Sequence, residues 1–240
     1  MSITPEQAAH DLRGAVVSVP GRVMTNPAVY ARGAELGFEG TDFYIAGRGG
    51  ALGNVPAGVV AAALVFFEPN MVRAAWEQSA AVMTRRETAV EWAAAFATLA
   101  PQILPEDRDW RLCTGLLGRV ADNALLAGAP LFAGWRALPE PEDLRALAMH
   151  RLNALRELRG ALHGAAVLTV GLLPMEAIAV HTPRMLKVFG WPGEPIDPEP
   201  LHQRWALAEA RTDRMFGRNL AVLDGTERGA LVEMLGNLES

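Results

Sequence analysis

The chain has 240 residues, of which half are apolar, and its formal net charge is −5. This length can bury a sizeable core in one large domain or two small ones, and the abundance of alanine with few strand-type runs predicts an all-α fold. The negative charge gives no general attraction to nucleic acid or to an anionic membrane, and the single cysteine, Cys113, excludes an internal disulfide and a cysteine-based zinc cluster.

Neither the N-terminal segment nor the apolar runs indicate targeting or membrane insertion. The opening segment MSITPEQAAHDLRG lacks the charged-then-apolar pattern of a signal peptide. The longest apolar run, residues 55–67, is too short to span a bilayer. We therefore expect a cytoplasmic protein.

Helix starts are marked along the first half of the chain. Three of them place a helix start directly at a proline, which is favoured in the first helical position: Thr4-Pro5, Asn26-Pro27 and Glu68-Pro69. The helix that follows Asn26 is expected to stop by Gly37. Thr84 and Glu87 have the spacing of a capping box. The acids after Pro105 predict another start, because the helix dipole favours negative charge in the first turn.

The glycine-rich segment FYIAGRGGALGNVPAG, residues 43–58, resembles a nucleotide-binding loop, but its spacing does not fit one. Position 52 is leucine where the dinucleotide fingerprint requires Gly or Ala, and no lysine follows as in a Walker motif. We interpret the segment as a tight turn ahead of a helix with Pro56 in its first turn. Arg48 in this turn either caps a neighbouring helix or faces a ligand, since helix N-termini favour anions.

Prolines divide the second half of the chain. A linker at Pro139 to Pro141 precedes a long helix expected over residues 142–171, and Pro174 starts the next. The loop GWPGEPIDPEP, residues 190–200, separates a main helical domain at 1–190 from a C-terminal part at 191–240. We expect about eight to ten helices in a single body, with the 142–171 helix central. Two C-terminal helices, roughly 201–223 and 227–238, pack on the body or on a second subunit, because they are too short to form a core alone.

The main site candidate is the run LRELRGALHGAAVLTVGLLPMEAIAVH, residues 155–181, which carries charges and histidines among apolar residues. Buried charge is unfavourable unless it is paired or hydrogen-bonded. At 100° per residue, Arg156, Arg159 and His163 share one flank of the helix. His150 and Glu157 share the far face.

Two interpretations of this flank remain open. In the first, Arg156 and Arg159 form salt bridges to neighbouring helices and His163 is a hydrogen-bonded core histidine. In the second, the flank lines a cavity in which the arginines hold an anionic or carbonyl oxygen. His163 then transfers a proton or serves as a ligand.

Other chemistries find less support. His163, Glu176 and His181 are one possible metal-ligand set, but Glu176 and His181 lie five apart rather than three or four. The cofactor therefore stays unknown, with haem on a lone histidine or a bound metal as alternatives. Cys113 is expected in the core rather than as a nucleophile. The only lysine, Lys187, lies in a stretch without a partner pattern, which disfavours Schiff-base chemistry.

Four stretches together resemble a known family: TDFYIAGRGGALGNV, LVFFEPNMV, AGAPLFAGWRALPEPEDLRALAMHRLNALRELRGALH and GLLPMEAIAVH. They are similar to an actinobacterial all-helical family of unassigned function that carries the label helix-turn-helix-like. The resemblance covers most of residues 35–182 and implies functional positions at Arg48, His150, Arg156, Glu157, Arg159, His163 and His181.

The chain departs from that family pattern in two places. Pro20-Gly21-Arg22 stands where the family has a His-Ala pair. After Gly190-Trp191 the family places a winged-helix-like segment, whereas this chain has only the proline-rich loop and two helices. This second departure predicts that the chain has no complete winged helix, and nucleic acid is therefore not the expected partner.

We expect a small-molecule-binding helical protein with a mostly apolar pocket, an enzyme of specialised metabolism whose reaction class is unknown. The alternative is a ligand-sensing transcriptional regulator or a non-catalytic partner protein. The expected catalytic residues are His163, Arg159 and Glu157; the expected ligand-binding residues are Arg48, Tyr44, His150, Arg156 and His181. We assign no metal ligands. The expected partner is a small organic molecule, with no membrane.

A homodimer is also predicted. The helix from His202 carries apolar side chains that something must cover, namely Trp205, Leu207, Ala208, Met215 and Leu220. A second copy is one way to cover them, since two-fold homodimers are the commonest oligomers.

Overall fold

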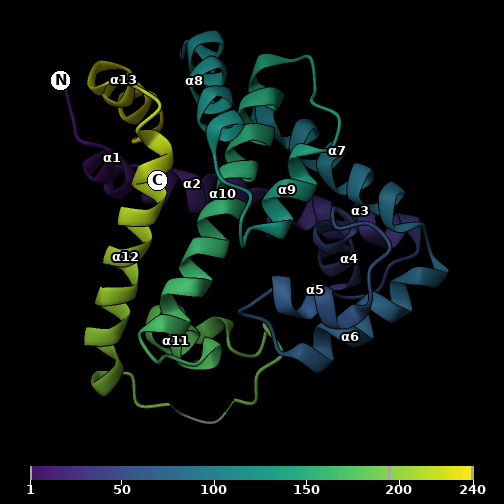
Figure 1. The fold of residues 1–240 in the computed structure, drawn as a ribbon. Coiled ribbons are helices and arrows are strands. Elements are labelled where there is room, and N and C mark those ends of the chain that lie inside the picture. The colour runs from purple at the N-terminus through teal and green to yellow at the C-terminus, as the bar shows by residue number, and fades with distance from the viewer. Residues whose placement is uncertain (1, 194–195, 239–240) are drawn as a thin grey trace.

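The structure, a computed structural model, describes residues 2–193 and 196–238. These residues form helices and connecting turns and contain no strand, so the all-α prediction is confirmed (Figure 1). The α-helices are α1 (Pro5–Asp11), α2 (Arg13–Met24), α3 (Pro27–Leu36), α4 (Asp42–Gly50), α5 (Ala57–Ala63), α6 (Pro69–Gln78), α7 (Arg85–Ile103), α8 (Trp110–Asn123), α9 (Pro130–Arg136), α10 (Leu144–Thr169), α11 (Pro174–His181), α12 (His202–Leu220) and α13 (Gly225–Leu235).

The described residues form thirteen α-helices, more than the sequence indicated. The helices that the sequence did not indicate are α2, which follows α1 after one residue, α4, which lies in the glycine-rich segment, and α9, whose seven residues are too brief to leave a clear periodic pattern. The expected loop at 190–200 includes residues 194 and 195, and the expected C-terminal part includes residues 239 and 240; these four lie outside the described residues.

The helix starts predicted at Thr4, Asn26, Glu68 and Thr84 form through local capping bonds. The Thr4 side chain accepts a hydrogen bond from the backbone N–H of Gln7 (3.1 Å), and the Asn26 side chain accepts one from Ala28 (2.9 Å). The capping box predicted for α7 forms. Gly37 ends α3 at φ +99°, a left-handed conformation that favours glycine.

The start predicted after Pro105 was wrong. Helix α8 begins at Trp110, and the side chain of Asp109 caps it by accepting from the Leu112 N–H (2.9 Å). The Trp110 indole N–H donates to the carbonyl oxygen of Pro105 (2.7 Å), which closes the preceding residues into a turn.

The glycine-rich segment is only in part the turn that we expected: residues 51–56 turn ahead of α5, but Arg48 and the residues before it are helical. Residues 42–50 form helix α4, which packs closely along α7. A Cβ atom at Gly47 would lie 2.6 Å from the Cβ of Trp92, and one at Gly50 would lie 2.3 Å from the carbonyl oxygen of Arg85. These glycines therefore let two helix backbones approach each other rather than bend the chain.

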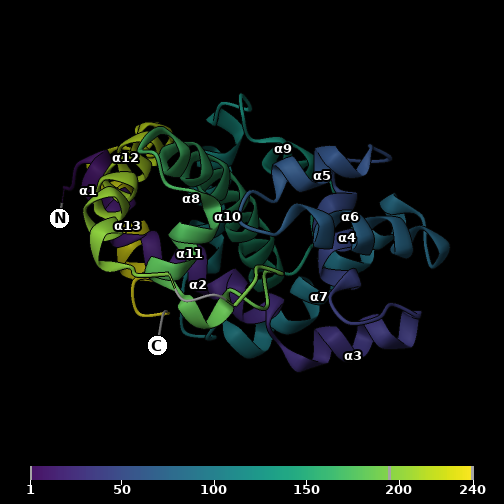
Figure 2. The ribbon, with the colours of Figure 1, turned by 90° about the horizontal axis from the view of Figure 1, so that it is seen from below.

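Helix α10 is central, as predicted. It contacts α2, α7, α8, α9, α11 and α12. Seen from below, α1, α12 and α13 lie on one side of α10, and α4 to α7 lie on the other (Figure 2). The Asp143 side chain caps α10 by accepting from the backbone N–H groups of Arg145 and Ala146 (3.0 and 2.9 Å).

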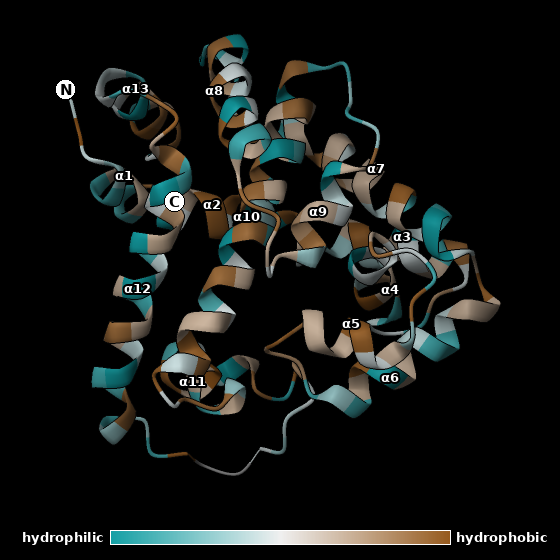
Figure 3. Cartoon of the chain, viewed as in Figure 1, coloured by the Kyte–Doolittle hydropathy of each residue, from teal (hydrophilic) through white to brown (hydrophobic). Residues whose placement is uncertain are grey.

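The two C-terminal helices pack on the body of their own chain, against α1, α8 and α10. Along α12, hydrophilic and hydrophobic residues alternate (Figure 3). Ala208 and Leu220 are fully buried, and Trp205 and Met215 pack against a buried cluster, whereas Leu207 stays exposed. The body thus covers most of the apolar surface from which a homodimer was inferred, and the homodimer stays a prediction.

Between α10 and α11 the chain turns sharply. Residues 170–173 separate the helices, which bend by 107°, and Gly171 in this turn has φ +74°. Among the described residues, no helix taken alone has both the length and the apolar composition to cross a membrane. The bent pair α10 and α11 meets those two criteria together.

Candidate functional site

A cavity of about 780 Å³ lies beside α10, between the two sides of the molecule. Side chains of α2, α4, α5, α10, α11 and α12 line it, and its wall is mostly apolar and aromatic. The apolar wall includes Val59, Leu64, Phe66, Phe67, Ile178 and Trp205. This volume is in the range of cavities that hold small organic molecules.

The cavity brings together most of the residues that the sequence singled out. They come from three helices: Tyr44, Arg48, Arg156, Glu157, Arg159, His163 and His181. His150 does not line this cavity. It lies further along α10, where its ring packs 5.1 Å from the ring of Trp135.

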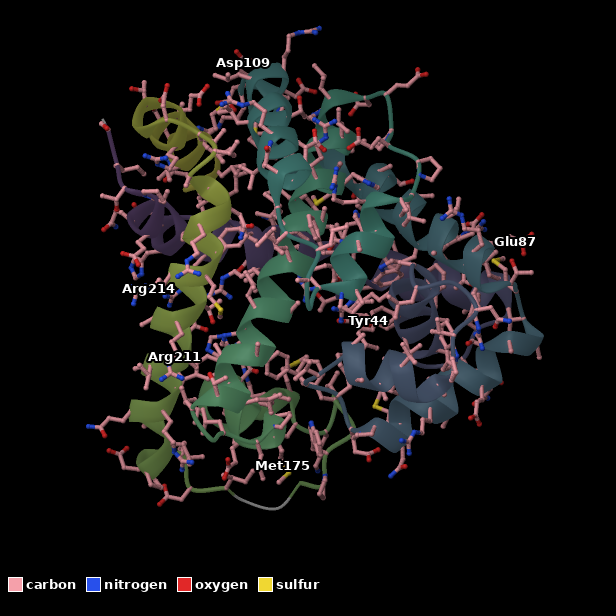
Figure 4. The ribbon with its side chains drawn as sticks, in the orientation of Figure 1. Tyr44, Glu87, Asp109, Met175, Arg211 and Arg214 are labelled. Atoms are coloured by element: carbon pink, nitrogen blue, oxygen red, sulfur yellow. The ribbon has the colours of Figure 1, made fainter. Side chains whose placement is uncertain are left out.

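At one end of the cavity, Arg48 on α4 and Glu157 on α10 form a buried two-bond ion pair. Nε and Nη2 of Arg48 donate to the two carboxylate oxygens of Glu157 at 3.0 and 2.8 Å. The remaining Nη1 donates to the Tyr44 hydroxyl oxygen at 2.9 Å. Tyr44 lies between α4 and α10 (Figure 4). Arg48 is therefore bonded through all three of its nitrogens, to side chains rather than to the end of a neighbouring helix, and it also lines the cavity.

The ion pair fixes the protonation of both groups. Burial opposes the charge on Arg48, but the Glu157 carboxylate and the Tyr44 oxygen raise the pKa of its guanidinium above the ordinary value. Burial also opposes ionisation of Glu157, yet Arg48 and then Arg156 hold the pKa of its carboxyl below the usual range. Both side chains are charged at neutral pH.

Arg156 approaches the same carboxylate with a single, longer bond. Its Nη1 donates to Oε1 of Glu157 at 3.3 Å, and its Nε has no hydrogen-bond partner among the described residues. The Arg156 side chain is 21% exposed. One carboxylate, Glu157, therefore faces two guanidiniums, and this end of the cavity carries one surplus positive charge.

At the other end of the cavity, positive and negative charges are equal in number. Nη2 of Arg159 donates to Oε2 of Glu209 on α12 at 2.8 Å, and Nε of Arg13 lies 3.0 Å from the same oxygen. Arg13 also bonds Asp213, whose second oxygen lies 3.6 Å from Arg159. Two guanidiniums here meet two carboxylates.

His163 lies at this balanced end. Its Nδ1 is 3.0 Å from the Thr212 hydroxyl oxygen and 3.5 Å from Oε1 of Glu209. Burial is the main cause that lowers the pKa of His163 to about 4, against the opposing effect of Glu209. The imidazole is therefore neutral at pH 7.

Aromatic rings surround His163. The ring of Phe66 lies 5.5 Å from it, and the ring of Trp205 meets it edge-on at 5.0 Å. His181 stacks on Trp205 with ring centroids 5.0 Å apart. Trp205 thus contacts both histidines of the cavity.

Parts of both interpretations of the α10 flank hold. Arg159 and His163 have protein partners, as the first interpretation requires, and the same side chains line a cavity, as the second requires. The sequence reasoning missed the partners on α12, namely Glu209, Thr212 and Asp213. The i, i+4 spacing of Glu209 and Asp213 would have placed two acids on one face, but it does not say what that face meets.

Two other candidates have structural roles. Cys113 is fully buried, and burial is the main cause that raises the pKa of its thiol to about 12, so it is a core residue. Glu176 accepts a hydrogen bond from the backbone N–H of Leu173 at the start of α11 (2.8 Å). Among the described residues, no three His, Cys, Asp or Glu side chains converge as metal ligands.

The fold and the cavity define an all-helical protein with a mostly apolar chamber and an ionic wall. The sequence model of a helix-turn-helix family matches residues 9–232, and the chain belongs to that family. No curated protein matches the chain. No solved structure matches it either.

The bent pair α10 and α11 is similar to a helix-turn-helix motif in its angle and its turn. DNA-binding pairs cross at roughly 90–120° through a short turn that often contains glycine, and here the bend is 107° with Gly171 in the turn. A recognition helix, however, presents polar side chains to the bases. In α11, Ala177 and Ile178 are buried and line the cavity. The second helix of this pair is a cavity wall.

Proposed function

We propose that this protein binds a small organic molecule with an apolar body and an anionic group in the α10 cavity. One observation carries the proposal: in the cavity wall, a single carboxylate, Glu157, faces the two guanidiniums of Arg48 and Arg156. A ligand anion at this end supplies the missing negative charge and accepts from the spare donors of Arg156.

Of the arginines expected at the site, Arg156 is the one that meets the ligand. Arg48 is fully bonded to Glu157 and Tyr44, and Arg159 is committed to Glu209. Nε is buried without a partner in both Arg156 and Arg159 among the described residues. Arg156 differs in that its one bond to Glu157 is long, 3.3 Å, and its side chain is 21% exposed, against 6% for Arg159. Arg156 therefore binds the anion, and Arg48 holds Glu157 in place.

The apolar walls set the character of the rest of the ligand. Phe66 and Phe67 follow α5, and Trp205 comes from α12; all three line the cavity. Aromatic walls favour a flat or polycyclic ligand body, because rings pack at 4.5–7 Å in stacked or edge-on contacts. We infer a carboxylate or sulfonate on an aromatic or polycyclic frame as the ligand class.

Binding is common to an enzyme of specialised metabolism and to a ligand-sensing regulator. Family membership favours the regulator as a second candidate. Arg211 and Arg214 on α12 are exposed, although Arg211 donates to Oγ1 of Thr169 at 3.0 Å and Arg214 lies 3.6 Å from Glu6. The same helix supplies Trp205 and Glu209 to the cavity. A gel shift with the DNA upstream of its own gene tests this candidate, and a ligand-dependent, salt-sensitive shift supports it.

The binding proposal is tested with two fluorescent probes that share an aromatic body. The first is 8-anilinonaphthalene-1-sulfonate, which is anionic, and the second is N-phenyl-1-naphthylamine, which is neutral. We expect Arg156→Gln to weaken binding of the sulfonate about tenfold, the effect of losing one charge-assisted hydrogen bond, and to leave the neutral probe unchanged.

The matched control is Arg145→Gln. Arg145 lies on the same helix with the same degree of exposure, 22% against 21%, and does not line the cavity. This variant removes the same charge but at a position outside the cavity. We therefore expect it to bind the sulfonate like the wild type. Equal losses in the two variants, or an equal loss of the neutral probe in Arg156→Gln, overturn the proposal.

A further inference from the structure

We propose that the ligand also carries a hydrogen-bond donor, a hydroxyl or a phenol, that meets Nε2 of His163 at the balanced end of the cavity. This inference rests on the proposed function and specifies the second polar group of the same ligand. It follows from the position of the imidazole proton of His163, which the contacts of its ring place on Nδ1.

The hydroxyl proton of Thr212 is already used. Its Oγ1 donates to the carbonyl oxygen of Ala208, one turn earlier on α12, at 2.8 Å. A threonine hydroxyl has only one proton. The contact of 3.0 Å between Thr212 Oγ1 and His163 Nδ1 therefore has the histidine as donor.

Glu209 favours the same assignment. Its Oε1 lies 3.5 Å from Nδ1 of His163, and a carboxylate attracts an N–H and repels a lone pair. A neutral imidazole carries one N–H and one lone pair. With the proton on Nδ1, the lone pair of His163 is on Nε2.

Nε2 has no hydrogen-bond partner among the described residues, although His163 lines the cavity. The rings of Phe66 and Trp205 pack near the imidazole, and among the described residues the indole N–H of Trp205 makes no hydrogen bond to it. A nitrogen lone pair in such surroundings is a ready acceptor for a ligand O–H.

The path between the two polar groups is open. His163 follows Arg156 by seven residues, which places both on one face of α10 about 10 Å apart along the axis. Between them lies Gly160, which lines the cavity, and a Cβ atom built on it would have no neighbour within 4 Å. A rigid bicyclic or tricyclic hydroxy acid has the length to reach from Arg156 to His163 along this open face.

A matched pair of probes tests the donor. The hydroxyl of 6-hydroxy-2-naphthoate donates a hydrogen bond, and the methoxy group of 6-methoxy-2-naphthoate does not. We expect the hydroxy acid to bind the wild type about fivefold more tightly, the effect of one hydrogen bond. His163→Phe keeps a ring in place without an acceptor and must abolish this preference. The control His150→Phe, which alters the other buried histidine of α10, must preserve it.

A second measurement does not depend on any variant folding. Nitrogen-15 NMR of the wild type distinguishes a protonated from an unprotonated ring nitrogen, and we expect a protonated Nδ1 and an unprotonated Nε2 at His163. Adding 6-hydroxy-2-naphthoate shifts the Nε2 resonance, whereas the methoxy compound does not. In Thr212→Val, where Nδ1 loses its main acceptor, we expect the preference for the hydroxy acid to shrink.

The outcomes separate this inference from the proposed function. A protonated Nε2, or equal affinities for the two naphthoates in the wild type, overturns the inference, and the proposed function stands if the sulfonate probe still depends on Arg156. If the sulfonate probe does not depend on Arg156, the proposed function fails and this inference fails with it.

Discussion

The two polar ends of the cavity use the same residue types but differ in charge balance. At the α4 end, Glu157 faces two arginines and one positive charge is left over. At the α12 end, Glu209 and Asp213 face Arg13 and Arg159, and the charges cancel. Ionic contacts alone therefore do not identify a binding site. We infer the binding site instead from a charge that the protein leaves unmatched beside an apolar chamber, because a ligand can match it.

The largest expected effect comes from removing the single carboxylate of the α4 end. Glu157→Gln leaves the buried guanidinium of Arg48 without an ionic partner, and we expect a loss of about 3–5 kcal/mol in the free energy of unfolding. In Glu209→Gln, Asp213 still faces Arg13 and Arg159, so we expect a smaller loss of about 1–3 kcal/mol. Urea unfolding of both variants measures the difference. An equal or larger loss in Glu209→Gln contradicts the charge assignment of the two ends.

At acidic pH, we expect the α12 end of the cavity to contribute less to the stability of the fold, because it contains His163. The pKa of this histidine is lowered to about 4 from an ordinary value of 6.5, mainly by burial. Between these pH values the unfolded chain binds a proton that the folded chain does not. Stability is therefore complete above pH 6.5 and falls as the pH drops toward 4, by about 3 kcal/mol for this group.

Denaturant unfolding at pH 7 and at pH 4 measures the loss in the free energy of unfolding between the two pH values. In His163→Phe we expect this loss to be smaller by the contribution of that histidine. The pKa of His150 is also lowered to about 4 by burial, so His150→Phe should remove a similar share while leaving probe binding intact. A wild-type pH dependence in His163→Phe would falsify the assignment.

The smallest expected effect on stability concerns the surplus charge itself. Arg156→Gln relieves an unmatched charge and should change the free energy of unfolding by less than about 1 kcal/mol. Arg159→Gln leaves Glu209 short of a donor and should destabilise by about 1–3 kcal/mol. Thermal unfolding of the pair measures the contrast. If Arg156→Gln proves the more destabilising of the two, Arg156 is a structural residue rather than a ligand-binding one.

Signals that act within one helix could be predicted from the sequence. The caps at Thr4, Asn26 and Thr84 involve residues two or three apart, so the local pattern is sufficient to identify them. The same holds for the long central helix, whose apolar stripe repeats over many turns. The local sequence does not show whether a glycine serves a turn or the close packing of two helices. Gly47 and Gly50 look like turn residues until Trp92 and α7 are known to pack against them.

The candidate site could be predicted only in part. The helical wheel placed His150 and Glu157 on one face, but two helical turns separate them along the axis, about 10 Å. At that distance they meet different helices: His150 packs on Trp135 of α9, and Glu157 pairs with Arg48 of α4. The acids of α12 lie some fifty residues from their arginine and histidine partners on α10. No local pattern encodes such a pairing.

The most direct test of the central claim is a crystal structure of the protein with bound 8-anilinonaphthalene-1-sulfonate. The account predicts that the aromatic body lies in the α10 cavity, between the side chains of Phe66 and Trp205, with the sulfonate within hydrogen-bonding distance of Arg156. A probe bound on the exterior of the molecule, or a sulfonate held at Arg159 and Arg13 instead, would contradict the claim that the unmatched charge at Arg156 defines the site.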